Sequence, residues 1–161
     1  MTTSLTFTAA VAAFTFLASG AACAQQKVDA TKSEIGFVSK QMGVPVEGKF
    51  KQWTAKIAFD PKAPATSALD VTVNMDHIDT FVPKLDAHMK SADMFDVAKF
   101  PTATFKSTAI EVTGPTTGKV TGNLTLHGVT KPVTLDTTFN GGGINPASKN
   151  YVIGFNATAR L

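Results

Sequence analysis

Cysteine is almost absent from this sequence of 161 residues. The single cysteine, Cys23, lies near the start of the chain. A domain that begins after Cys23 cannot form a disulfide bond, use a thiol nucleophile or ligate an iron–sulfur cluster through cysteine. Lipidation of Cys23 stays an open alternative, although Gly20 stands where a lipoprotein signal places leucine.

Charge is absent from the first 26 residues, since Lys27 carries the first charged side chain. The stretch from Leu5 to Ala22 is apolar and small, and residues 22–24 fit a small-residue cleavage site. We therefore predict a secretory signal peptide over residues 1–24 and one exported domain over residues 25–161. A retained membrane anchor is the alternative.

A large excess of one charge is also absent. The chain has 15 basic and 12 acidic residues, a net charge of +3, and the two signs are mixed along it. No basic cluster with interleaved aromatic residues is present, which disfavours nucleic-acid binding. The small positive excess gives at most a mild attraction to anionic head groups or membrane surfaces.

Sequence motifs of catalysis are missing as well. There is no Gly-x-Ser-x-Gly, His-Glu-x-x-His, Cys-x-x-Cys-His or phosphate-loop motif. The histidines His77, His88 and His127 lie far apart and lack the spacing of metal ligands. Asp76 and Asp79 could do acid–base work if buried together, but such residues more often cap helices and shape turns. We predict no enzyme, no metal site and no cofactor.

Alternation of apolar and polar residues is what the sequence does contain. A period of two predicts strands with one apolar and one polar face. Turn residues such as Asp60-Pro61 and Gly141-Gly142-Gly143 separate these runs. About seven strands are expected, over residues 34–39, 55–59, 69–76, 102–112, 120–127, 133–139 and 151–158.

A short helix interrupts this pattern. Val82, Leu85 and Met89 recur at helical spacing between Pro83 and Ser91. Because helix-length segments are missing between the other runs, we expect hairpins and an antiparallel sheet. Such a sheet can fold as a sandwich or close into a barrel, and the pattern alone leaves that choice open.

A series of local motifs resembles one known family, the YceI-like or polyisoprenoid-binding family. Their order and spacing make the match specific, and it runs from Ser33 to the end of the chain. The matching segments are Ile35-Gly36-Phe37, residues 46–50, 57–61, 78–80, 86–96, 100–107 and 120–133.

The resemblance implies an extended antiparallel, lipocalin-like barrel, usually periplasmic, whose apolar tunnel holds a polyprenyl lipid or an isoprenoid quinone. Relatives often carry glycine or asparagine where Phe81 stands here. They also usually continue beyond Leu161 into a final strand, so we expect this chain to lack its last strand. A membrane-bound b-type cytochrome is a partner implied by some relatives, and a homodimer is one alternative for the oligomeric state.

The candidate ligand site consists of inward apolar residues and a polar mouth. The mouth is assigned to Lys84, His88 and Lys90, which could meet a head group, with Trp53 and the Val82/Leu85/Met89 face beside them. The candidate tunnel residues are Phe37, Ile57, Phe59, Leu69, Val71, Val73, Leu124, Leu126, Phe139, Tyr151, Ile153 and Phe155.

We consider three competing hypotheses of function, of which the first is the leading one. The first is a carrier that binds and shields a long apolar lipid. The second is a non-enzymatic stress or interaction protein whose barrel is filled by its own side chains. The third is a lipid-modifying enzyme that uses Asp79 and His88.

Overall fold

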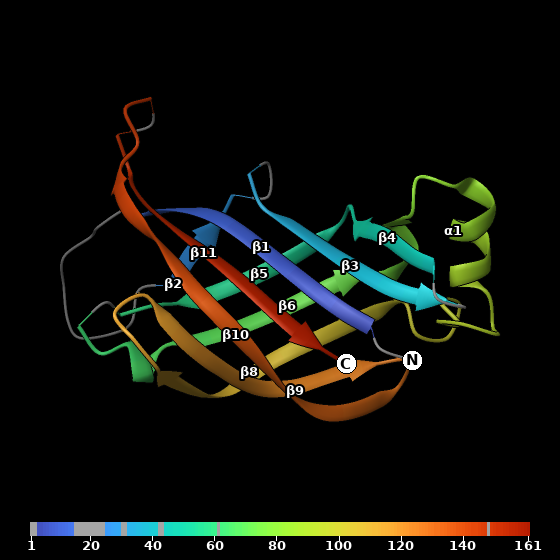
Figure 1. Cartoon of the computed structure of the whole chain (residues 1–161). Helices are drawn as coiled ribbons and strands as arrows, with labels where there is room; N and C mark the ends of the chain where they lie inside the picture. Colours follow the sequence, from blue (N-terminus) through green and yellow to red (C-terminus); the bar gives the residue numbers. More distant parts are fainter. Residues whose placement is uncertain (1–2, 15–24, 30–31, 42–43, 61, 148) are drawn as a thin grey trace.

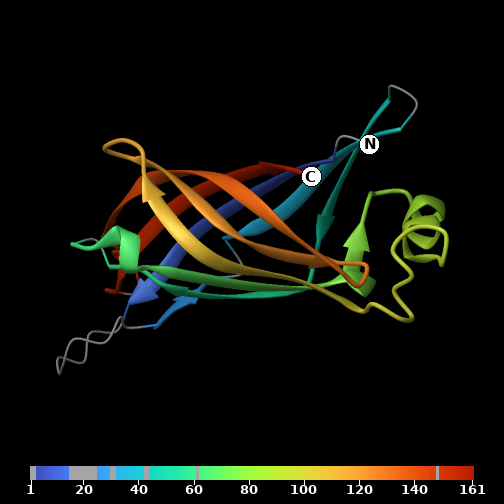
Figure 2. The ribbon, with the colours of Figure 1, turned by 90° about the horizontal axis from the view of Figure 1, so that it is seen from below.

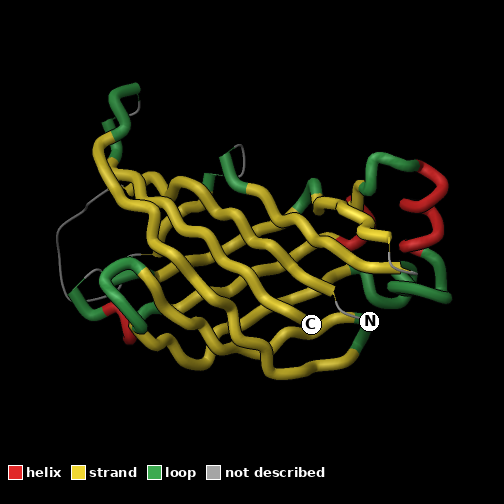
Figure 3. Tube along the Cα trace, viewed as in Figure 1, coloured by secondary structure: helices red, strands yellow, loops and turns green. Residues whose placement is uncertain are grey.

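Most of the described residues lie in strands (Figure 3). The computed structural model describes residues 3–14, 25–29, 32–41, 44–60, 62–147 and 149–161. The strands are β1 (Thr3–Phe14), β2 (Gln25–Val28), β3 (Glu34–Gln41), β4 (Val44–Phe50), β5 (Trp53–Ala58), β6 (Ala68–Asn74), β7 (Ile78–Asp79), β8 (Thr102–Val112), β9 (Thr117–Leu126), β10 (Val129–Ile144) and β11 (Tyr151–Arg160).

All strands belong to one sheet in the order β11-β10-β9-β8-β6-β5-β2-β1-β3-β4-β7, and β11 also pairs with β1. Every one of these pairings is antiparallel. The circuit from β1 through β11, β10, β9, β8, β6, β5 and β2 returns to β1, so the sheet closes on itself (Figure 1). The predicted all-β, antiparallel, lipocalin-like barrel with one short helix is confirmed.

Helical segments lie at the ends of the barrel. The helix α1 (Pro83–Lys90) begins with proline at its first position and buries Met89. It covers one end of the elongated sheet, as two perpendicular views show (Figures 1 and 2). Short 3₁₀ turns, η1 (Pro64–Thr66) and η2 (Met75–His77), lie before and after β6.

Alternation produces the core in the way the sequence predicts. In β6, Val71 and Val73 are buried whereas Asp70 and Thr72 are exposed. Neighbouring strands do the same, so that one face of the sheet becomes the barrel interior. The buried apolar cluster contains Ile35, Phe37, Phe50, Val71, Val73, Met75, Ile78, Met89, Val97, Ala103, Phe105, Val120, Leu135, Ala157 and Ala159.

Residues 3–14, which the sequence assigns to the signal peptide, form strand β1. It pairs with β11 from Ser4↔Arg160 to Phe14↔Tyr151, and with β3 from Thr3↔Ser39 to Thr8↔Glu34. Because β11 pairs with β10 on its other side, both of its edges are occupied. Cleavage after Ala24 and a missing final strand stay predictions, and Gly20 and Cys23 lie outside the described residues.

The seven predicted strands correspond to β3, β5, β6, β8, β9, β10 and β11. The range of β8 matches the prediction, whereas β10 is longer and includes the glycines of residues 141–143. Strands β1, β2, β4 and β7 were not predicted as strands. In β4, Gly48 breaks the alternation of apolar and polar side chains that would have predicted a strand. The Phe37 ring occupies the space beside Gly48, since a Cβ at position 48 would be 2.5 Å from Phe37 Cζ.

Candidate functional site

Among the residues that the structure describes, two apolar cavities line the barrel interior, one toward each end. The larger, of about 340 Å³, is lined by residues of β3, β4, β6, β8, β9, β10 and β11 and by the segment that follows α1. The smaller, of about 280 Å³, is lined by η1, β5, β6, β8, β9, β10, β11 and the β8–β9 turn. Apolar pockets of about this size are typical of small-ligand sites in β-barrels.

The larger cavity is lined almost wholly by apolar side chains. Ser39, Asp93 and Thr104 are the polar residues among those that line it. The rings of Phe37 and Phe50 contact each other in it, tilted by 39° with centroids 5.4 Å apart. The apolar members are Ile35, Phe37, Phe50, Val71, Val73, Met75, Met89, Met94, Phe95, Ala103, Phe105, Leu124, Leu126, Val133, Leu135, Ala159 and Leu161.

The smaller cavity contains a cluster of three aromatic rings. Phe59 meets Phe155 edge to face with centroids 5.1 Å apart, and Phe139 lies 5.3 Å from Phe155. Ile57 and Leu69 line the same space. Its polar members are Ser67, Glu111, Thr116, Thr117 and Thr137, so hydroxyl groups and one carboxylate are the side-chain hydrogen-bonding groups available to a ligand there.

The two cavities follow one another along strand β9. On β9, Val120 lines the smaller cavity and Leu124 the larger one, with Gly122 between them. The ring of Phe105 lies over Gly122, because a Cβ there would be 2.5 Å from Phe105 Cζ. Phe105 therefore lies at the boundary between the cavities.

Ten of the twelve predicted tunnel residues line one of these cavities. Tyr151 and Ile153 are not among the lining residues. Tyr151 is 47% exposed at the start of β11, where it pairs with the exposed Ile144 in a hairpin that projects from the barrel (Figure 1). Ile153 is buried. The larger cavity holds Phe37, Val71, Val73, Leu124 and Leu126, and the smaller holds Ile57, Phe59, Leu69, Phe139 and Phe155.

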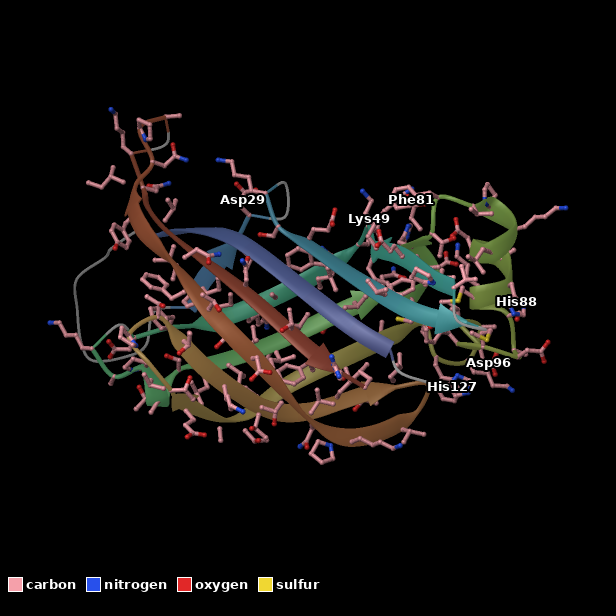
Figure 4. All side chains as sticks on the ribbon, viewed as in Figure 1. Asp29, Lys49, Phe81, His88, Asp96 and His127 are labelled. Carbon is pink, nitrogen blue, oxygen red and sulfur yellow. The ribbon has the colours of Figure 1, made fainter. Side chains whose placement is uncertain are left out.

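The predicted mouth residues lie on α1 but outside both cavities. Lys84 and His88 are exposed, and His88 points away from the barrel (Figure 4). The Lys90 ammonium pairs with Asp76 at 3.5 Å. Of the apolar face predicted beside them, Met89 lines the larger cavity, Leu85 is half-buried and Val82 is exposed. Trp53 packs against the core cluster.

Asp79 forms an ion pair rather than an acid–base pair with His88. Its carboxylate lies 2.8 Å from Lys51 Nζ and accepts a hydrogen bond from the Phe81 N–H at 2.9 Å. Hydrogen bonding from Lys51, followed by that from the Phe81 backbone, lowers the pKa of Asp79 below its usual 3.8. The same pair raises the pKa of Lys51 above 10.5. Both groups are thus held in their charged forms.

The three histidines lie in different parts of the fold. His77 is in η2, His88 is on α1, and His127 occupies the β9–β10 turn, where its ring lies 4.8 Å from that of Phe100. In the described part of the chain, no three histidine, cysteine or carboxylate residues gather as a metal site would require. Among the same residues, no helix combines the length and apolar character needed to cross a membrane.

An antiparallel barrel with an apolar, hollow interior is the class of protein that this geometry defines. A family model described as the YceI-like domain matches residues 26–161. The chain belongs to the YceI-like family.

Relatives support this assignment. A UPF0312 protein of Pseudomonas savastanoi pv. phaseolicola is 44% identical over 116 residues, which are 72% of this chain and 60% of the relative. Protein YceI of Salmonella arizonae is 39% identical over 139 residues, covering 84% of this chain and 72% of the relative. The chain thus spans about 60% of the length of the first of these relatives.

Solved structures share the fold. BcnA of Burkholderia cenocepacia matches with a TM-score of 0.70 and 29% identity, over 81% of this chain and 98% of that one. The YceI protein of Campylobacter jejuni matches with a TM-score of 0.66 and 32% identity, over 73% of this chain and 68% of that one.

Proposed function

We propose that this protein binds and shields a long apolar lipid, a polyisoprenoid or an isoprenoid quinone, inside its barrel. The observation that carries the proposal is the pair of apolar cavities that follow one another along the barrel. Together they offer an elongated apolar space rather than a compact one. A chain-like apolar molecule fits such a space better than a compact polar one.

Burial supplies the driving force. Each methylene group removed from water contributes about 0.8 kcal/mol. Ten such groups contribute roughly 8 kcal/mol before the entropic costs of binding. The side chains that would replace water around the lipid include the Phe59, Phe139 and Phe155 cluster at one end and Phe37 and Phe50 at the other. Binding then needs no catalytic group.

The proposal places the lipid head group at the end of the barrel near α1. Met89 of α1 and the following Met94 and Phe95 line the larger cavity there. Asp93 supplies a polar group at the same place, and Lys84 and His88 lie on the outer surface of the helix. A head group that emerged between these elements would meet polar groups while its tail stayed in the cavities.

The proposed location is the periplasm, with residues 1–24 as the export signal. A lipid-shielding protein is needed there because a polyprenyl tail cannot cross an aqueous compartment unshielded. Cleavage of this signal after Ala24 would remove β1, whose backbone pairs with β3 and β11.

Native mass spectrometry of the gently purified full chain, followed by extraction with organic solvent, tests the proposal. We expect a mass excess over the bare chain and release of a polyprenyl or quinone lipid. A bare mass, with nothing extracted, would contradict the proposal and favour a barrel filled by its own side chains.

Variants that fill the cavities sharpen the test. Leu124→Trp fills the larger cavity and Leu69→Trp the smaller one, so each should lower lipid occupancy. Val129→Trp is the matched control because Val129 is exposed on β10. Circular dichroism establishes that each variant is folded. Equal occupancy in all three variants would place the lipid outside these cavities.

A further inference from the structure

Positive charge is missing from the lining of both cavities, although basic residues outnumber acidic ones in the chain by 15 to 12. Among the residues that the structure describes, no lysine, arginine or histidine lines either space. The charged side chains that do line them are carboxylates, Asp93 in the larger cavity and Glu111 in the smaller one. The charge that a bound molecule meets along these walls is therefore negative.

Ser39 brings a hydroxyl group into the larger cavity. On β3, Ile35, Phe37 and Ser39 all line this space at a spacing of two residues, so the Ser39 side chain faces inward with the other two. Ser39 is two residues from the end of β3, and this end of the strand points toward α1 (Figure 1). The hydroxyl therefore lies at the end of the cavity where Asp93 follows the helix.

The carboxylate of Asp93 is available to a ligand. Asp93 is exposed and also lines the larger cavity, so it stands where the apolar space opens to solvent. Within the described part of the chain it takes part in no ion pair. The lysines closest to it in the sequence have other partners, since Lys90 Nζ lies 3.5 Å from Asp76 and Lys99 Nζ lies 3.0 Å from Asp96.

These two groups differ in the head groups that they accept. A carboxylate only accepts hydrogen bonds, whereas a serine hydroxyl both donates and accepts. A lipid that ends in a hydroxyl group can therefore donate to Asp93 and accept from Ser39. A phosphate or diphosphate meets a like charge at Asp93 and loses water without gaining a cation in the cavity. An oxidised quinone offers acceptors alone and leaves Asp93 without a donor.

We propose that the larger cavity selects lipids with a hydroxyl head group, such as a polyprenol or a quinol, over lipids with a phosphate or diphosphate head group. Asp93 accepts the hydrogen bond of the hydroxyl and repels an anionic head group, and Ser39 donates to the same hydroxyl oxygen. This selectivity rests on the proposed lipid-binding function and adds to it the chemical class of the head group.

Displacement of Nile red, an uncharged fluorescent dye, from the purified full chain tests the proposal. The competitors are farnesol and farnesyl phosphate, which share one isoprenoid tail and differ in the head group alone. We expect farnesol to displace the dye at a concentration about tenfold lower than farnesyl phosphate does. Because the tails are identical, the ratio of the two concentrations reports the head group and not the burial of the tail.

Variants of Asp93 connect this ratio to one side chain. Asp93→Lys should reverse the preference, because an ammonium group attracts the phosphate. Asp93→Asn should keep farnesol binding and strengthen farnesyl phosphate binding severalfold, since the amide retains an accepting oxygen without the charge. Asp136→Lys is the matched control: it makes the same change of charge on β10, where Asp136 is exposed and the preceding Leu135 lines the larger cavity. It should keep the ratio of the wild type.

The outcomes separate this selectivity from the proposed function. Equal displacement by the alcohol and the phosphate, or the same change of ratio in Asp93→Lys and Asp136→Lys, would overturn the selectivity and leave lipid binding in place. Displacement of the dye by neither competitor would overturn the proposed lipid binding and the selectivity with it.

Discussion

The ring of Phe105 lies directly against Gly122 on the neighbouring strand. A Cβ at position 122 would be 2.5 Å from Phe105 Cζ and 2.5 Å from the Lys106 carbonyl oxygen. Both distances are shorter than any real Cβ contact, so only glycine permits this packing. The boundary between the two cavities thus depends on a residue without a side chain.

Gly122→Ala should therefore destabilise the fold. The new methyl group must displace the Phe105 ring and the β8 backbone, at a cost of about 1–3 kcal/mol. Chemical denaturation with the free energy of unfolding as readout measures this cost. Gly143→Ala is the control, because a Cβ at position 143 meets nothing within 4 Å. Equal stability of the two variants would contradict the packing described for Phe105.

Phe105→Leu should join the two cavities into one longer space. Leucine keeps an apolar side chain at the boundary but removes the ring, at a cost of about 1–2 kcal/mol in stability. If the proposed lipid occupies the barrel, the extracted lipids should shift toward longer chains, as mass spectrometry would show. Phe100→Leu is the control, since Phe100 lines neither cavity and contacts His127. An unchanged lipid profile in Phe105→Leu would show that Phe105 does not limit ligand length.

The ion pair between Lys51 and Asp79 should set part of the pH dependence of stability. The pKa of Asp79 is lowered from 3.8 chiefly by its hydrogen bond from Lys51, so its contribution is present above pH 3.8 and is lost as the pH falls through the lowered value. The pKa of Lys51 is raised from 10.5, so its contribution is present below pH 10.5 and is lost as the pH rises through the raised value.

Asp79→Asn should consequently flatten the loss of thermal stability in acid. Asparagine still offers an oxygen to the Phe81 N–H, so the turn is kept while the charge is removed. Melting temperatures measured from pH 7 down to below pH 3.8 would show this. Asp70→Asn, exposed on β6, should leave the acid limb of the curve as it is in the wild type. A limb that is equally steep in Asp79→Asn would mean that other carboxylates control it.

Alternation predicted which side chains face the interior but not how deep along the barrel each one lies. Phe105 and Ile110 lie an odd number of residues apart on β8, so a regular strand would place them on opposite faces, yet each lines a cavity. Both point inward because the register to β9 shifts between Ser107 and Ala109. Tyr151 continues the alternation of β11 but lies in a hairpin beyond the barrel, after the register shift between Phe139 and Gly141. Such shifts depend on cross-strand packing, which a linear pattern does not contain.

The sequence pattern predicted α1 but not which residues at its start are exposed. Helical spacing grouped Val82 with Leu85 and Met89, whereas Val82 is exposed and only Met89 is buried. Phe81 departs from the residues that relatives often carry at this position, but its positive φ and the hydrogen bond from its N–H to the Asp79 carboxylate are features of the folded turn. The spacing of three apolar residues in a short helix does not show which of them is buried and which is exposed.

Strand β1 closes the sheet by pairing with β11. It pairs with β11 over ten residue positions and with β3 over six. A chain of residues 25–161 would leave the facing edges of β3 and β11 without this partner, and unpaired edges favour association with another copy. We expect the shortened chain to melt at a lower temperature than the full chain and to associate as its concentration rises.

Light scattering after size exclusion and thermal melting of both chains measure the effect. Ala9→Pro in the full chain offers a milder change, because proline removes one backbone N–H from the middle of β1. It should lower the melting temperature by less than the deletion does. If the shortened chain is monomeric and as stable as the full chain, β1 is not required to close the barrel. In that case the two edges must reach each other or be covered by other parts of residues 25–161.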